Sequence, residues 1–395
     1  MLPQSMNFSA TPILNLIVAL ALGTDVVAQS ESPSPRTILG AEDRRVQTTP
    51  RQDKSGGRRG PRTPNNFNPQ PPPQNFNNDG PWNRDVIAYR VVAGGAVVKA
   101  TTFERAGVPT IARMTDGRII LAHQHFPEND REHFDKVAVH FSSDDGRTWT
   151  TSQVIQMAGR PEGMRFPFDP TLVPLPDGRV RLYFSGNMSQ TFERGTPAIH
   201  SAISTDGVNY TYEPGVRFQL ANRMTIDCAA VLHQDLFHLF VPDNGVLLSP
   251  GQRPGSEAAG DRPREGVGYH ATRQDGLSFT RIDDVTIDGR RRWLGNAESD
   301  GEHITFYGTG EGLNTASKAN GRPSGGFWMA TSAEGQKWNL VANPLISGGD
   351  PGAVKTRDGG LLVVITGESR LRPGGLRRGG AENNVLPTPP RRGPG

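Results

Sequence analysis

A ten-residue pattern occurs four times in this 395-residue chain, at nearly constant intervals. Each copy has an acid, a glycine, two free positions and an aromatic residue. The copies are FSSDDGRTWT (141–150), AISTDGVNYT (202–211), ATRQDGLSFT (271–280) and ATSAEGQKWN (330–339). The acids that precede each glycine are spaced 61, 69 and 59 residues apart, and they are Asp145, Asp206, Asp275 and Glu334. A repeat interval of this size predicts a repeat architecture, and it constrains the fold more than any other feature.

The chemistry of each copy favours a tight turn. Ser and Asp side chains can accept hydrogen bonds from nearby backbone amides, and the glycine can adopt a positive φ. Apolar residues alternate in the stretch that leads into each turn, as expected for a strand. We expect the aromatic residue to fold back under the hairpin and to pack between neighbouring sheets.

A second set of turn signals alternates with the first. Asp-Gly dipeptides begin at Asp116, Asp177, Asp300 and Asp358, and Asp235 marks a fifth turn without its glycine. An apolar, β-rich run follows each of them. Every unit therefore reads as strand, Asp-Gly turn, strand, strand, recurring turn, strand. About 60 residues per four-stranded unit is the size of a β-propeller blade.

The count of units predicts how the propeller closes. Five first hairpins but only four second hairpins leave the last blade half complete. Two strands without partners lie at the front, within 85–104. We expect them to complete the last blade and remove the open edges of the ring. The predicted fold is an all-β, five-bladed propeller, with six blades as the alternative.

Composition divides the chain into four segments. Residues 1–28 contain the apolar run ILNLIVALAL, too short to span a bilayer, before small residues that suit cleavage, so they predict a secretory signal peptide. An uncleaved N-terminal anchor is the alternative. Residues 29–84 and 371–395 are rich in Pro, Gly and Arg and predict disorder. Residues 85–370 are the predicted propeller domain. We therefore expect a secreted, periplasmic or cell-envelope protein.

Charge follows the same division. Residues 85–370 carry 29 Lys and Arg against 33 Asp and Glu, whereas 29–84 and 371–395 each have a net charge of +4. The basic arms are typical of solvated linkers or of attachment to an anionic envelope or polysaccharide. We expect no nucleic-acid partner, no transmembrane span after cleavage, and a monomer. Cys228 is the only cysteine, which rules out an intrachain disulfide and suggests a small buried residue.

Three acids mark the predicted active end of the propeller. Eight residues before each Asp-Gly turn stand Val108, Asp169, Asp227, Arg292 and Asp350. Innermost strands converge on the axis, so we expect the carboxyl groups of the three Asp residues to lie close together. Like charges at short range raise each other's pKa, which separates an acid from a base. The alternative is that Asp before Pro only starts a strand, which explains Asp169 and Asp350 better than Asp227.

Basic and polar residues are expected at the same end. Some of the arginines would pair with the acids and others could bind a carboxylate or sulfate; they are Arg105, Arg160, Arg165, Arg223 and Arg292. The ends of the second strands supply potential partners for sugar hydroxyls, which can equally be ordinary loop residues: Asn187, Asp243, Asn244, Glu311 and Glu368.

His123 and His125 alternate on one strand and could point inward together. They could bond a sugar hydroxyl, act as acid and base, or ligate a divalent metal together with a nearby Asp. His-x-His alone is a weak metal signal, and the sequence requires no cofactor.

The recurring turns resemble a known family. In the first copy, Ser142, Asp144, Gly146, Thr148 and Trp149 match every defined position of the Asp-box, also called the BNR repeat, of the sialidase superfamily. The segment GVPTIARMTDGRIILAH (107–123) resembles the opening strands of sialidases. This resemblance implies a propeller, usually six-bladed, and an arginine triad that binds the sialate carboxylate. Gly107 stands where the first arginine of that triad belongs.

The acids on the inner strands look more like those of the five-bladed propeller glycosidases, the arabinanase, xylosidase and fructosidase group. That resemblance implies three catalytic carboxyl groups from consecutive blades, one of them a Glu. Here the acids come from blades two, three and five and all are Asp, and Glu298 lies near the other end of its strand.

The sequence thus supports three hypotheses. The first is a secreted, sialidase-like glycoside hydrolase in which Asp169 and Asp227 act as acid and base or nucleophile, and Asp350 tunes their pKa values or bonds a hydroxyl. In this hypothesis, Arg165 and Arg223 would recognise an acidic or sulfated sugar of the glycan. The second is a non-catalytic propeller that binds a carbohydrate or protein. The third is a polysaccharide lyase with His123 or His125 as base.

Overall fold

The computed structural model describes residues 80–92, 95–165, 167–188, 197–246, 263–264, 266–287, 291–310 and 326–370. All of them belong to one compact unit, Arg62–Gly395. The predicted signal peptide, nearly all of the predicted disordered arm at 29–84, the C-terminal tail and Glu311 lie outside the described residues. Within the described part of the chain, no helix is long and apolar enough to cross a membrane.

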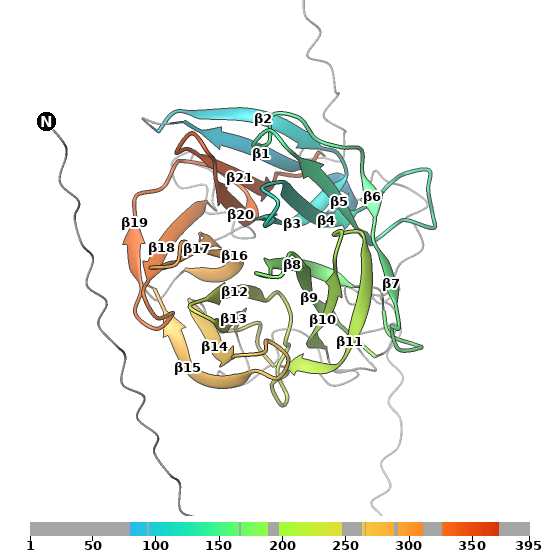
Figure 1. Cartoon of the computed structure of the whole chain (residues 1–395), viewed down its shortest axis with the longest axis vertical. Helices are drawn as coiled ribbons and strands as arrows, with labels where there is room; N and C mark the ends of the chain where they lie inside the picture. Colours follow the sequence, from blue (N-terminus) through green and yellow to red (C-terminus); the bar gives the residue numbers. More distant parts are fainter. Residues whose placement is uncertain are drawn as a thin grey trace, which may run out of the picture. The chain divides into compact units, whose positions relative to one another are not determined.

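Five antiparallel sheets surround a central axis as the blades of a propeller (Figure 1). The first strand of each blade is innermost, and each inner strand contacts the inner strand of the next blade, so the ring is continuous. The predicted five-bladed, all-β fold is confirmed. Blade 1 contains β3 (Ala106–Arg113), β4 (Ile119–His125), β5 (Lys136–Ser142) and β6 (Gln153–Val154); blade 2 contains β8 (Phe168–Pro174), β9 (Val180–Gly186), β10 (Ala198–Ser204) and β11 (Asn209–Phe218), with β7 (Gln156–Ala158) parallel to β11 at its edge; blade 3 contains β12 (Ala229–His233), β13 (Leu236–Pro242), β14 (Val267–Arg273) and β15 (Thr280–Thr286); blade 4 contains β16 (Arg292–Ser299), β17 (Ile304–Thr309), β18 (Phe327–Ser332) and β19 (Asn339–Val341); blade 5 contains β20 (Gly349–Lys355), β21 (Leu361–Thr366), β1 (Val86–Val91) and β2 (Val97–Phe103).

The N-terminal strands close the ring as the sequence predicts. Strand β1 pairs with β21 along its whole length, from Val86 opposite Thr366 to Val91 opposite Leu361. Strand β2 then covers the outer edge of β1. A 3-10 helix, η1 (Pro81–Asn83), precedes β1, and Asn83 is buried. Residues 80–84, just ahead of the predicted boundary at residue 85, thus contact the folded domain.

The first recurring turn is held by its own side chains. The hydroxyl of Ser142 accepts the backbone N–H of Gly146 at 2.8 Å, and Asp144 accepts the N–H of Thr148 at 2.8 Å. Gly146 has φ +78°, where a side chain would be strained. Ser204 and Ser332 make the same bond in the second and fourth turns. In the first turn Asp144 therefore holds the position of Asp206, and Asp145 is an additional residue.

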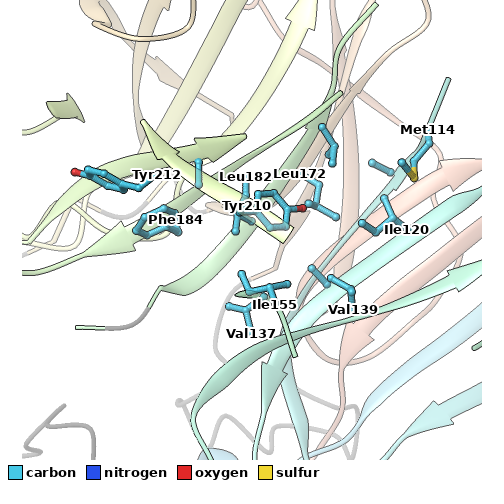
Figure 2. Close-up of a cluster of buried hydrophobic side chains, with 14 of the residues drawn as sticks. Met114, Ile120, Val137, Val139, Ile155, Leu172, Leu182, Phe184, Tyr210 and Tyr212 are labelled. Atoms are coloured by element: carbon cyan, nitrogen blue, oxygen red, sulfur yellow. The ribbon is translucent and has the colours of Figure 1, made fainter. Parts of the chain in front are cut away.

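The aromatic residue of each turn packs between its own blade and the preceding one. Tyr210 belongs to the apolar cluster between blades 1 and 2, with Ile120, Val139 and Leu182 (Figure 2). Phe279, Trp338 and Trp149 occupy the corresponding clusters at the other junctions. The recurring aromatics are thus part of the propeller core.

Asp145 joins blade 1 to blade 5. Its buried carboxylate pairs with Arg113 at 2.9 Å and accepts the backbone N–H of Arg357, in the hairpin turn of blade 5, at 3.1 Å. Its carbonyl accepts a hydrogen bond from Arg90 on β1. This additional residue therefore contributes polar contacts at the junction where the ring closes.

Candidate active site

The inner strands share a local distortion near their starts. Pairing shifts by an extra residue just after Gly107, Phe168 and Gly349. The residues at this point have left-handed backbone conformations: Val108 (φ +49°), Asp169 (φ +50°), Asp227 (φ +63°) and Asp350 (φ +52°). A bulge of this kind re-aims a side chain, and Asp tolerates the conformation better than most residues. The three Asp side chains are thereby directed differently from those of a regular strand.

The structure brings the three predicted catalytic acids together. Asp169, Asp227 and Asp350 line one small cavity at the axis, with Val108, Gly295 and Asn296. Its volume is about 10 Å³. A cavity of about this size accommodates one water molecule when polar groups surround it. The site therefore presents three carboxyl groups around a space that fits a single water.

Asp169 and Asp227 form a hydrogen-bonded carboxyl pair. Burial and the neighbouring charge of Asp227 hold the pKa of Asp169 well above its usual range. Burial also raises the pKa of Asp227, but its bond to Asp169, the charge of Arg292 and its bond to Asn244 oppose that rise. These surroundings favour the proton on Asp169 over Asp227. The two carboxyl groups titrate as a unit.

Asp350 is the third acid, and it titrates in a different range. Burial and the charge of Asp227 raise the pKa of Asp350 to about 6. Its Oδ2 accepts a hydrogen bond from Thr366 at 3.1 Å, and the positive charges of Arg292 and Arg84 limit the rise of the pKa. Near neutral pH, Asp350 can therefore exchange a proton readily, as a general acid or base must.

Arg292 does not occupy the position that the eight-residue count predicts. The bulge in blade 4 is larger, because Arg292 pairs with Thr309 and Gly295 with Gly308. Gly295 therefore lines the axial cavity. Arg292 still lies near enough for its charge to lower the pKa of Asp227 and Asp350. Among the described residues, no ion pair within 4.0 Å involves Arg292.

The other predicted arginines are engaged in structural contacts. Arg165 is 6% exposed, pairs with Asp135 at 2.6 Å and lies over the ring of Phe168. Arg223 pairs with Asp243 at 3.1 Å. Arg105 bonds Glu128 and the carbonyl of Trp82, and Arg160 bonds the carbonyl of Met164. These contacts fit the expectation that some arginines pair with acids.

The histidines lie apart from the three acids. His123 is buried, and its Nε2 atom lies 3.1 Å from Nε2 of His140. His123 and His125 do share a face of β4, with ring centroids 5.8 Å apart, but His123 packs beside Phe103 of blade 5. Burial and the neighbouring His140 lower the pKa of His123 to about 3 and that of His125 to about 4. His123 therefore lies at the junction of two blades and does not line the axial cavity, whereas a role of His125 stays a prediction.

Four of the remaining predicted polar residues lie just beyond the ends of second strands. Asn244 donates a hydrogen bond to Asp227 at 3.3 Å, so it belongs to the acid cluster. Asp243 is buried and links Arg223 to Arg264, at 3.1 and 2.7 Å. Asn187 is buried, and its carbonyl accepts the N–H of Arg165. Glu368 is exposed, just beyond β21.

Glu298 lies where the sequence places it, away from the three acids. It lines a second cavity of about 350 Å³ together with Arg113 and Met114, both near the opposite ends of the inner strands. Its carboxyl group accepts a hydrogen bond from the hydroxyl of Tyr307 at 2.9 Å.

Sequence reasoning missed Arg84, Ser185 and Thr366. Arg84 falls in the segment predicted to be disordered, yet its charge acts on Asp350. Ser185 and Thr366 contact the acids directly. A signal for these two exists, because second strands of blades 2, 4 and 5 end in a hydroxyl residue followed by glycine, as in FSG, GTG and ITG.

The described ranges contain no group of three or more His, Cys, Asp or Glu residues arranged to hold a metal ion. The proposed His123/His125 ligand pair in particular has Nδ1 of His123 at 2.8 Å from the carbonyl of Gln124 and Nε2 against His140.

No family model and no curated protein matches this sequence. Several solved structures have similar folds. A β-1,3-galactosidase of glycoside hydrolase family 43, bound to galactodeoxynojirimycin, is 12% identical over 72% of this chain and 95% of its own, with a TM-score of 0.44. An endo-1,4-β-xylanase from Bacteroides thetaiotaomicron is 13% identical over 67% and 85%, with a TM-score of 0.43. A family 43 arabinoxylan arabinofuranohydrolase from Bacillus subtilis, in complex with cellotetraose, is 14% identical over 69% and 65%, with a TM-score of 0.42. The proposed chemistry therefore rests on the side chains of this chain alone.

Proposed function

We propose that this chain is a glycoside hydrolase. The observation that carries the proposal is the cluster of Asp169, Asp227 and Asp350 around one cavity, with pKa values driven apart by their surroundings. Glycoside hydrolysis needs one carboxyl group that donates a proton and one that accepts a proton or attacks. A cluster that contains both an ionised and a protonated carboxyl group supplies that pair.

The hydrogen bond between Asp169 and Asp227 changes their assigned roles. Two catalytic carboxyl groups flank the glycosidic bond about 5 to 9.5 Å apart, so a pair in direct contact cannot act on opposite sides of it. We assign the base to Asp227, which Asp169 holds in the ionised form, and the general acid to Asp350. A water molecule in the axial cavity would be the nucleophile.

The substrate we propose is a glycan or polysaccharide, and we do not extend the proposal to sialic acids. Recognition of a sialate carboxylate needs several arginines free to converge on it. Arg165 and Arg223 are each paired with an acid instead. Arg292 and Arg84 are the arginines whose charges act on the acid cluster. The predicted signal peptide supports a secreted or envelope location as part of the same proposal.

The test is release of reducing ends from a panel of neutral, uronic, sulfated and sialylated glycans by purified residues 29–395. Asp227→Asn and Asp350→Asn should both lose activity by at least about 1,000-fold. Asp177→Asn is the matched control, because this exposed turn residue pairs only with Arg179 and lies at the other end of its strand. Product stereochemistry, followed by NMR, reports the mechanism.

Absence of hydrolysis across the panel, together with saturable glycan binding, would favour the non-catalytic propeller instead. Unsaturated products that absorb in the ultraviolet would indicate a lyase. The burial of His123 between two blades argues against His123 as the base of a lyase and leaves His125 as the other candidate.

A further inference from the structure

Three buried hydroxyl groups occupy the same place in blades 2, 4 and 5. Ser185, Thr309 and Thr366 stand at or near the ends of β9, β17 and β21. Each pairs with the inner-strand residue at the start of the bulge: Phe168, Arg292 and Gly349. Their exposed fractions are 0%, 0% and 6%, so each hydroxyl must satisfy its hydrogen bonds within the protein.

Each hydroxyl oxygen accepts a backbone N–H from the next blade. Ser185 accepts from Asp227 at 3.0 Å, Thr309 from Asp350 at 3.1 Å, and Thr366 from Val108 at 2.9 Å. The three donors all have a positive φ. A bulge removes such an N–H from the regular ladder, and a buried N–H without an acceptor is costly. The hydroxyls therefore allow the distorted backbone on which the acids stand.

Each hydroxyl group also forms a hydrogen bond within its own blade, and the acceptor of that bond differs among the three sites. Thr366 donates to Oδ2 of Asp350 at 3.1 Å, and Ser185 bonds the carboxyl group of Asp169. Thr309 donates to the carbonyl of Leu294 at 2.9 Å. Two of the three hydroxyls thus connect an acid of one blade to the backbone of the next, and the third connects backbone to backbone.

We infer that Thr366 and Ser185 are positioning residues for the acid cluster: each orients the carboxyl group of its own blade and fixes it to the positive-φ residue of the following blade. This inference rests on the proposed function for its catalytic meaning. A hydroxyl that donates to a carboxylate stabilises the ionised form. The hydrogen bond from Thr366 therefore opposes the rise in the pKa of Asp350.

Among the described residues, four charged side chains act on Asp350 or are acted on by it, and they come from four different parts of the propeller. Asp227 and Asp169 face it from blades 3 and 2, Arg292 from β16, and Arg84 from the segment before β1. A change at Thr366 alters none of these charges, because Val replaces Thr with a side chain of the same shape. The effect of Thr366→Val on Asp350 then reports the lost hydrogen bond.

The test compares three variants of the full chain by carbon NMR titration of the Asp carboxyl groups, with Asp350→Asn to identify the resonance of Asp350. Thr366→Val should raise the pKa of Asp350 by about one unit, because a hydrogen bond to a charged group is worth that much. Thr366→Ser keeps the hydroxyl and should leave it unchanged. Thr309→Val is the stringent comparison: it removes the acceptor for the backbone N–H of Asp350 itself, but no bond to a carboxyl group.

An unchanged Asp350 pKa in Thr366→Val, or a shift as large in Thr309→Val, overturns the inference. The pH profile of glycan hydrolysis is the second readout, and its alkaline limb should move upward by the same amount in Thr366→Val alone. If the chain hydrolyses no glycan, the proposed function fails, whereas the titration still decides whether Thr366 positions Asp350.

Discussion

Asp169 and Asp227, which stand on neighbouring blades, line one axial cavity, and each carboxyl group acts on the pKa of the other. Burial raises the pKa of both groups, and Arg292 and Asn244 oppose the rise at Asp227. A buried pair of like acids cannot both ionise, so the surroundings decide which one keeps the proton. The ionisation of these carboxyl groups and the propeller ring that holds them both have testable consequences.

Asp227→Asn is expected to abolish hydrolysis while the protein stays folded. The variant removes the ionised base but keeps an amide that can accept the hydrogen bond from Asp169. Activity should fall by at least about 1,000-fold, and the melting temperature at pH 7 should not fall. Steady-state kinetics and calorimetry check both points, and an active Asp227→Asn protein would remove Asp227 from the mechanism.

The pH dependence of activity should reflect Asp350. A general acid with a pKa of about 6 is protonated below that value. The rate constant kcat/KM should therefore decline about tenfold per pH unit above pH 6. Measurements between pH 4 and 9 test this expectation, and a rate that still increases above pH 8 contradicts the role of Asp350 as acid.

Asp350→Asn should stabilise the protein at alkaline pH. The pKa of Asp350 is raised in the folded state, to about 6, above its unfolded value near 4. The stability linked to its protonation is thus fully present below about pH 4 and lost as pH rises through 6. At pH 8 the variant should gain up to about 3 kcal/mol, and at pH 4 almost nothing. Calorimetry at the two pH values measures the difference, and equal gains at both would show that titration of Asp350 is not the cause.

Asp145→Ala should weaken the closure of the ring. The side chain of Asp145 is 7% exposed, pairs with Arg113 and accepts a hydrogen bond from the backbone N–H of Arg357. Loss of one partner from a buried ion pair costs about 3 kcal/mol. Chemical denaturation of Asp145→Ala measures the cost. Asp116→Ala, which removes an exposed acid paired with Arg118, should leave the midpoint almost unchanged, and equal effects of the two would argue against the junction.

Val108→Gly should relieve strain in blade 1. A β-branched residue at φ +49° in front of Pro109 is held in a conformation that costs about 1–3 kcal/mol, and glycine adopts it freely. The greater flexibility of the unfolded glycine chain offsets about 1 kcal/mol of that gain. We expect the free energy of unfolding to stay equal or to increase, and a loss above about 2 kcal/mol would contradict the strain.

Much of this architecture could be read from the sequence because it repeats. Each recurring turn carries its own hydrogen bonds, as Ser142 and Gly146 show, so the pattern is local and needs no tertiary context. The missing half-blade likewise follows from counting hairpins, and β1 fills it. The eight-residue spacing identified Asp169, Asp227 and Asp350 because all three have a left-handed backbone conformation at the same point of their blades.

Contacts between blades are what the sequence alone could not reveal. The face of β4 that carries His123 looked free to turn inward, but only the packed ring places Phe103 of blade 5 against it. Arg292 does not lie at its expected position, because the bulge of blade 4 is larger. The spacing of the turn signals in the sequence does not indicate that difference. Local turns and strand order were therefore determined by the sequence, since neighbouring residues make them. The different pKa shifts of Asp169 and Asp227 were decided only by the tertiary structure, because a pKa depends on burial and on charges brought from other blades.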